Sequence, residues 1–149
     1  MLLEAQDVGL LSRLHRTLMF FVNQRLKVIP DNLATPMEFA VLSPPIRAKV
    51  RDALLTNIGL IDSFVEENPG HFTEDELDIV RSWHLLVAGR FYVFRELAKY
   101  TVFVSTSAPA IAYGVLALSQ PFEDLVGPVL PVLTETVLLP FKEIGRAHV

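Results

Sequence analysis

The chain changes its residue pattern within the stretch Trp83-His84-Leu85-Leu86-Val87-Ala88-Gly89-Arg90-Phe91-Tyr92-Val93-Phe94-Arg95. Before Trp83, apolar residues recur at steps of three and four, which is typical of the buried face of a helix. After Trp83, β-branched and aromatic residues become dense, which favours strands. The change predicts an α+β fold: an N-terminal layer of three helices, followed by a small, mainly antiparallel sheet.

The helical part is expected to span residues 1–84, with helices over 5–27, 45–67 and 74–84. Proline and turn-forming residues at Pro30-Asp31-Asn32 and Asn68-Pro69-Gly70 end the first two helices. Ser43-Pro44-Pro45 indicates a cap and a helix start, and Thr73 with Glu76 has the spacing of a capping box. Residues 33–42 fit no single element, because Pro36 interrupts them.

The β-rich part is expected to span residues 85–142, with strands or strand-bearing segments over 86–97, 100–105, 111–118 and 129–141. Several of these runs are apolar at consecutive positions, as in a sheet that is covered on both faces. The last seven residues, Glu143-Ile144-Gly145-Arg146-Ala147-His148-Val149, match the translation of a common short-read sequencing adapter up to its stop codon. We therefore expect 143–149 to be a non-native tail, irregular and exposed, and the sheet to be incomplete after Lys142.

Composition excludes several kinds of site. The 13 basic and 17 acidic residues give a net charge of −4, so no global attraction draws the chain to nucleic acid or anionic lipid. The absence of cysteine excludes disulfides, thiolate zinc sites and a cysteine nucleophile. Met1-Leu2-Leu3-Glu4 lacks the basic start of a signal peptide, and prolines with Glu135 interrupt the apolar stretch 125–141. We expect a cytoplasmic protein with no membrane partner.

Residues that could take part in catalysis or metal binding are scattered along the chain. His15, His71, His84 and His148 do not have the spacing of a helical zinc site, and no phosphate-binding glycine loop, nucleophile elbow or dinucleotide motif is present. The sequence therefore predicts neither a metal site nor a cofactor. The acidic pair Glu123-Asp124 could act as acid and base if the two side chains converged. Pairing of a carboxylate such as Glu135 with Arg90, Arg95 or Lys142 across the sheet is a simpler account.

Basic and aromatic residues interleave between Gly89 and Tyr100. Exposed aromatics beside cations can stack on single-stranded nucleic acid, but the order Arg-Phe-Tyr-Val-Phe differs from the RNA-recognition strand pattern, and strand aromatics commonly lie in the core. The candidate binding residues are Arg90, Phe91, Phe94, Arg95, Lys99 and Glu123.

The chain resembles an uncharacterised bacterial protein family for which no activity is established. The resemblance covers most of residues 15–142, and its most distinctive stretches are Phe91-Tyr92-Val93-Phe94-Arg95, Lys99-Tyr100-Thr101-Val102-Phe103, Tyr113-Gly114-Val115-Leu116, Pro121-Phe122-Glu123 and Thr136-Val137-Leu138-Leu139-Pro140-Phe141-Lys142. Relatives accompany small cysteine-rich zinc motifs, and this chain has no cysteine, so the resemblance implies no metal here.

Three functions remain open. The first is a cytoplasmic, non-enzymatic binding or regulatory protein with an unknown protein partner. The second is an enzyme whose active site is completed by a segment beyond Lys142, with Glu123, Asp124 and Arg90 as available polar groups. The third is a β module that binds single-stranded nucleic acid. An exposed aromatic and basic sheet face would favour binding, and a pocket with converging polar groups would favour the enzyme.

Overall fold

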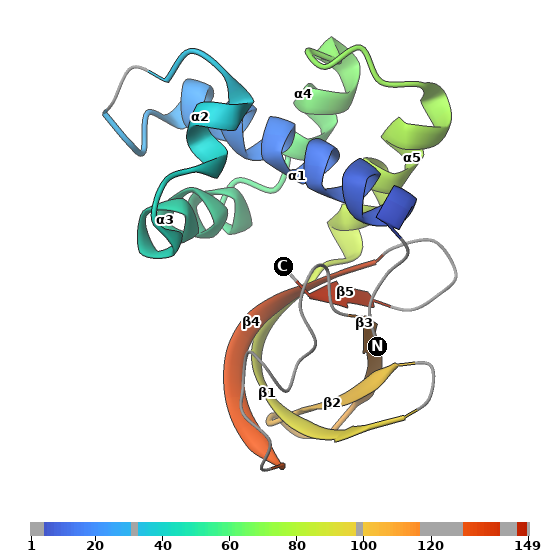
Figure 1. Ribbon diagram of the computed structural model, residues 1–149. Helices are drawn as coiled ribbons and strands as arrows, with labels where there is room; N and C mark the ends of the chain where they lie inside the picture. The colour runs from blue at the N-terminus through green and yellow to red at the C-terminus, as the bar shows by residue number, and fades with distance from the viewer. Residues whose placement is uncertain (1–4, 31–32, 98–99, 117–129, 141–145, 149) are drawn as a thin grey trace. The chain divides into compact units, whose positions relative to one another are not determined.

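A computed structural model describes residues 5–30, 33–97, 100–116, 130–140 and 146–148 of the chain. By its internal contacts the chain forms two compact units, Gly9–His84 in one and Met1–Val8 with Leu85–Val149 in the other. Helices make up the first unit and strands dominate the second (Figure 1). The predicted α+β class is confirmed, with the helices N-terminal and the strands C-terminal.

The first helix, α1 (Ala5–Leu26), forms where its apolar spacing predicts it. Its buried face carries residues three or four positions apart, namely Leu11, Leu14, Leu18, Phe21 and Val22. The helix ends because Lys27 takes a left-handed backbone conformation with φ 53°. The side-chain oxygen of Asn23 then accepts a hydrogen bond of 2.8 Å from the amide of Ile29, which satisfies the donor that the helix no longer uses.

A short helix, α2 (Pro36–Ala40), lies within residues 33–42, for which no single element was predicted. Thr35 caps it, and Glu38 returns the bond to the Thr35 amide, so a complete capping box starts the helix. Pro36 fits at the first helical position because its missing amide hydrogen would have no acceptor there. Phe39 is its buried residue.

The single helix predicted over 45–67 is wrong, since two helices occupy this range: α3 (Pro44–Leu55) and α4 (Leu60–Glu67). The side chains of Thr56 and Asn57 both bond to the carbonyl of Ala53, at 3.0 and 2.9 Å, where a continuing helix would place backbone amides. Gly59 then starts α4. The apolar stripe concealed this break because residues on both sides of it are buried.

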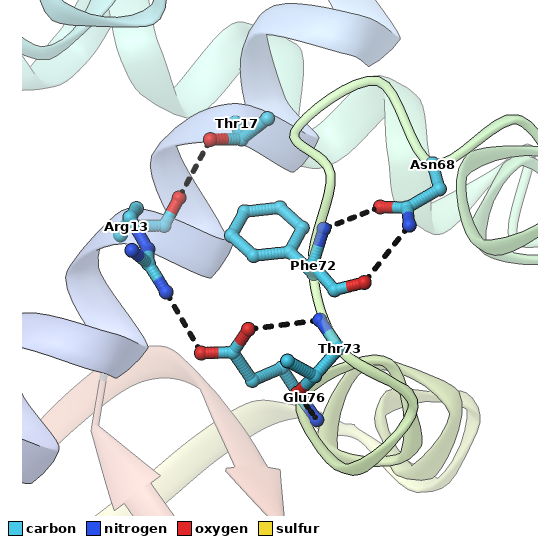
Figure 2. Close-up of polar contacts among 6 residues, drawn as sticks. All are labelled: Arg13, Thr17, Asn68, Phe72, Thr73 and Glu76. Carbon is cyan, nitrogen blue, oxygen red and sulfur yellow. Dashed lines mark hydrogen bonds and ion pairs between the residues drawn. The ribbon is translucent and has the colours of Figure 1, made fainter.

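The third predicted helix is confirmed as α5 (Glu74–Ser82), which a 3-10 turn, η1 (Trp83–Leu85), extends. Thr73 and Glu76 form the predicted capping box. Asn68 ends α4 in the left-handed region, and its side chain bonds both the amide and the carbonyl of Phe72, at 2.8 and 2.9 Å (Figure 2). These bonds fix the loop between α4 and α5, and Phe72 packs near Phe64 in the helical core.

The predicted strands are confirmed as β1 (Val87–Glu96), β2 (Thr101–Ser105), β3 (Ala112–Leu116) and β4 (Val132–Pro140). With β5 (Arg146–His148) they close into a barrel in the order β1-β2-β3-β5-β4 (Figure 1). Neighbouring strands are antiparallel except β3 and β5, which are parallel. Alternate residues point inward and form the barrel core, which contains Phe91, Val93, Phe103, Val115 and Leu138.

The expectation of an irregular C-terminal tail is wrong for residues 146–148. Arg146–His148 pairs with Val115 and Leu116 on β3 and with Leu138 to Pro140 on β4, so the sheet that was expected to stay open is closed there. Such pairing uses backbone groups, and it therefore tolerates a segment with little strand-forming sequence. The rest of the expected tail, residues 143–145 and 149, lies outside the described residues.

Candidate binding surface on the barrel

The outward face of β1 carries the residues that the sequence analysis singled out. Phe91 and Val93 point into the barrel and are buried, while Arg90, Tyr92 and Phe94 alternate with them and are exposed. This alternation follows from the two-residue repeat of a strand with one face on a core.

A β-bulge then changes the alternation. Val93 pairs with Phe103, but the next pair is Arg95 with Val102, so Phe94 is an extra residue on β1. In a regular strand the residue after Phe94 would point into the barrel, whereas in this structure both Phe94 and Arg95 are exposed. The bulge therefore brings an aromatic ring and a guanidinium together on the outer surface.

Neighbouring strands extend the apolar part of this surface. Tyr92 stands opposite Leu133 on β4 and opposite Val104 on β2. Tyr92, Phe94 and Leu133 retain 45%, 50% and 52% of their accessible surface, which is high for large apolar side chains. We call Arg90, Tyr92, Phe94, Arg95 and Leu133 the outer patch.

The charges around the outer patch are partly paired. Arg90 stands directly opposite Glu135, and Nε of Arg90 lies 3.7 Å from Oε2 of Glu135. The pairing of Arg90 across the sheet agrees with the interpretation of the sequence. Glu96 follows Arg95 but stands opposite the buried Thr101, so the alternation of the strand places it on the other face of β1. Two cations and one anion, Glu135, therefore border the aromatic side chains.

Tyr100 adds a third aromatic ring to the outer face. Its carbonyl accepts a hydrogen bond of 2.8 Å from the amide of Leu97, which closes the turn between β1 and β2. The ring covers Gly114 so closely that a Cβ at this position would lie 3.0 Å from Cδ2 of Tyr100. Gly114 pairs with Val102, and Val102 pairs with Arg95, so Tyr100 lies over the same side of the sheet.

The predicted site residues separate into three groups. Arg90, Phe94 and Arg95 are exposed together on the outer face of β1. Phe91 is 1% exposed and packs with Phe103 and Tyr113 in the core, so its assignment as a binding residue is corrected to a core residue. Lys99 and Glu123 lie outside the described residues.

Two patch residues were not predicted. Tyr92 could have been found from the sequence, because it lies two residues from both Arg90 and Phe94 and shares their face of a regular strand. Leu133 could not, because its place depends on the register between β4 and β1.

No protein-family model, curated protein or solved structure matches the chain. No helix among the described residues is long and apolar enough to cross a membrane. In the same part of the chain, no three histidine or acidic side chains come together in a way that could hold a metal ion.

The polar residues of the helical unit connect its helices. Arg13 on α1 lies over the ring of Phe72, 5.2 Å from its centroid, and donates a hydrogen bond of 2.7 Å to Glu76 on α5 (Figure 2). The amide of Thr73 also donates to Glu76, and this bond, with the charge of Arg13, lowers the pKa of the carboxyl. These contacts stabilise the packing of α1 against the start of α5.

The histidines of this unit also make structural contacts. Nε2 of His84 lies 2.9 Å from Oδ1 of Asp62, which links η1 to α4. His15 packs edge-on against Trp83, with ring centroids 6.4 Å apart. Burial, together with the charges of the Arg47 and Arg51 guanidiniums, lowers the pKa of His15 to about 4. The His15 ring is therefore neutral at pH 7.

Proposed function

We propose that this chain is a non-enzymatic, cytoplasmic binding protein that engages a polypeptide partner through the outer patch. The observation that carries the proposal is the exposure of Tyr92, Phe94 and Leu133 between two arginines on one face of the barrel. Aromatic residues and arginine are enriched in protein interfaces, where rigid rings bury a large area at small entropic cost. Large apolar side chains that cluster on a surface commonly mark such a contact.

The charges support a polypeptide partner over a polyanion. Arg90 of the outer patch has Glu135 opposite it, and the whole chain carries a net charge of −4. A nucleic-acid surface gains most of its affinity from unbalanced positive charge. A partner with apolar side chains and charges of both signs complements this surface better.

Binding of single-stranded nucleic acid is the second candidate. It is favoured by three exposed aromatic residues, Tyr92, Phe94 and Tyr100, beside Arg90 and Arg95. Stacking of bases on such rings is worth about 1–3 kcal/mol per base, even without sequence-specific contacts.

The test compares two double variants of the full chain. Tyr92→Ser with Phe94→Ser removes the outer patch, and Met37→Ser with Val41→Ser removes two exposed apolar residues of the helical unit as a matched control. We expect the first variant to lose specific partners in quantitative affinity capture, and the control to retain them. Purified partners should then bind the wild-type chain at least tenfold more tightly than the patch variant. Equal capture and affinity for both variants, with both folded by circular dichroism, would reject the proposal.

The same variants distinguish the second candidate function, binding of single-stranded nucleic acid, from binding of a polypeptide. A labelled homopolymer of deoxythymidine is titrated with each protein, and fluorescence anisotropy reports binding. If the protein binds single strands, the oligomer should bind the wild-type chain and the control but not the patch variant, and its affinity should fall steeply with salt. If the polypeptide proposal is right, the oligomer should bind none of them appreciably.

A further inference from the structure

The shortest strand among the described residues, β5, lies between two longer strands. β5 has three residues, and it pairs with Val115 and Leu116 of β3 on one side and with Leu138, Leu139 and Pro140 of β4 on the other. β3 has five residues and β4 has nine. Among the described residues, β5 is therefore the short segment that joins the two long edges. The edges of β3 and β4 that β5 bridges form a site for one strand, and we call this site the strand slot.

The residues that border the strand slot indicate which kind of strand would fit there. Residues directly opposite each other on paired strands lie on the same face of a sheet. Position 146 stands opposite Val115 and Pro140, and position 148 stands opposite Leu138. Val115 and Leu138 belong to the barrel core, and each is 0% exposed. A strand that matches this core would therefore have apolar residues at these two positions.

The other face of the slot is apolar as well. Position 147 stands opposite Leu116 and Leu139, and each of these residues is 5% exposed. Strands that are buried on both faces consist of nearly continuous apolar, β-branched residues. The strand slot thus has the surroundings of a central strand.

The sequence of β5 does not match these surroundings. It is Arg146-Ala147-His148, so basic residues hold both positions opposite the core and no residue is β-branched. Strands that are covered on both faces favour apolar, β-branched residues at every position, and arginine, alanine and histidine are not of this type. Backbone hydrogen bonds hold β5 in place, and they would hold any extended segment equally well.

We infer that the strand slot is an acceptor site for an extended, apolar strand donated by another polypeptide, and that β5 is a weak occupant which such a strand displaces. The donated strand runs parallel to β3 and antiparallel to β4, and it places apolar residues at the positions opposite Val115 and Leu138. This mode of recognition takes its affinity from backbone pairing and its specificity from alternate side chains. The site is distinct from the outer patch, which uses side chains on the outer face of β1 and β4.

The experiment measures the binding of two synthetic peptides to the full chain. The test peptide places valine, threonine and valine at the positions of 146, 147 and 148 between terminal lysines, and the control peptide replaces both valines with arginine. We expect the test peptide to bind at least tenfold more tightly than the control. The variant Arg146→Val with His148→Val strengthens β5 as a competitor, so its affinity for the test peptide should fall at least tenfold while its thermal midpoint rises.

A second variant weakens the internal competitor instead. Ala147→Pro removes a backbone donor from β5, and the test peptide should then bind more tightly than it binds the wild-type chain. If this variant does not fold, the valine variant decides the question alone. Equal binding of both peptides, or a valine variant with unchanged affinity and midpoint, would overturn the inference. A concentration-dependent dimer that the test peptide dissociates would assign the slot to a second copy of this chain and would also overturn it. Tyr92→Ser with Phe94→Ser changes only the outer patch, so it should leave the binding of the test peptide unchanged. A failure of the proposed function can therefore be distinguished from a failure of the strand-slot inference.

Discussion

Tyr92 on β1 stands directly opposite Leu133 on β4, and both side chains face away from the barrel core. One residue earlier on β1, Phe91 points inward and lies against Phe103 and Tyr113. Two adjacent aromatic residues therefore have opposite environments. Since the same strand provides both the core and the outer patch, substitutions along β1 separate folding from binding.

Phe91→Ala and Phe94→Ala should differ sharply in stability. Phe91 is 1% exposed, so its truncation leaves a cavity in the core and should lower the free energy of unfolding by about 3–5 kcal/mol. Phe94 is 50% exposed, so its truncation should change this free energy by less than about 1 kcal/mol. Urea denaturation followed by circular dichroism measures both. Similar losses for the two variants would show that the inward and outward faces of β1 are misassigned.

The pair Arg90 and Glu135 should contribute little to stability. Its atoms are 3.7 Å apart, and both side chains are well exposed, with 67% and 76% of their surface accessible. A double-mutant cycle with alanine at both positions should give a coupling of about 0.2–1 kcal/mol, which decreases as salt screens the charges. A coupling that is larger, and insensitive to salt, would indicate that the pair is shielded from solvent.

The sequence predicts the elements whose signal is local. The spacing of Leu11, Leu14 and Leu18 predicts α1, and the capping box of Thr73 and Glu76 places the start of α5 within one residue. Strands β1 to β4 follow from runs of β-branched and aromatic residues. Each of these signals depends on neighbours in the chain, so no tertiary information is needed to interpret it.

The features that the sequence did not predict depend on contacts between distant residues, or on competition between side chains and backbone for the same hydrogen-bond acceptor. The break between α3 and α4 arises because Thr56 and Asn57 satisfy the carbonyl of Ala53, although the apolar spacing continues past it. β5 forms because the edges of β3 and β4 supply its hydrogen-bond partners, which its own sequence does not indicate. Phe91 and Phe94 lie three positions apart and so face opposite sides of a strand, but only the packing of the sheet decides which of them is exposed. The bulge, which adds Arg95 to the exposed side, has no signal in the sequence.

Thr73→Ala should weaken α5 more than its exposure suggests. The Thr73 hydroxyl accepts from the amide of Glu76 at 3.3 Å, and its amide donates to Glu76 at 2.9 Å. Loss of the side-chain cap should lower the free energy of unfolding by about 1 kcal/mol. Thr73→Ser keeps the acceptor and should restore most of the loss. If serine and alanine gave the same stability, the threonine methyl group and not the cap would be responsible.

Stability should fall as the pH is lowered, because of His15. Burial and the charges of Arg47 and Arg51 lower its pKa from 6.5 to about 4 in the folded state, while the unfolded chain keeps the ordinary value. Between these two values the unfolded state binds more protons, so protonation favours unfolding. The native protein should therefore lose stability as the pH falls from about 6.5 to 4, by roughly 2 kcal/mol after allowance for the partial exposure of the ring. His15→Gln removes the titrating group and should flatten the profile of unfolding free energy over this range. A wild-type profile that stays level from pH 6.5 to 4, or an equal slope in His15→Gln, would show that His15 takes up its proton in the folded state as readily as in the unfolded chain.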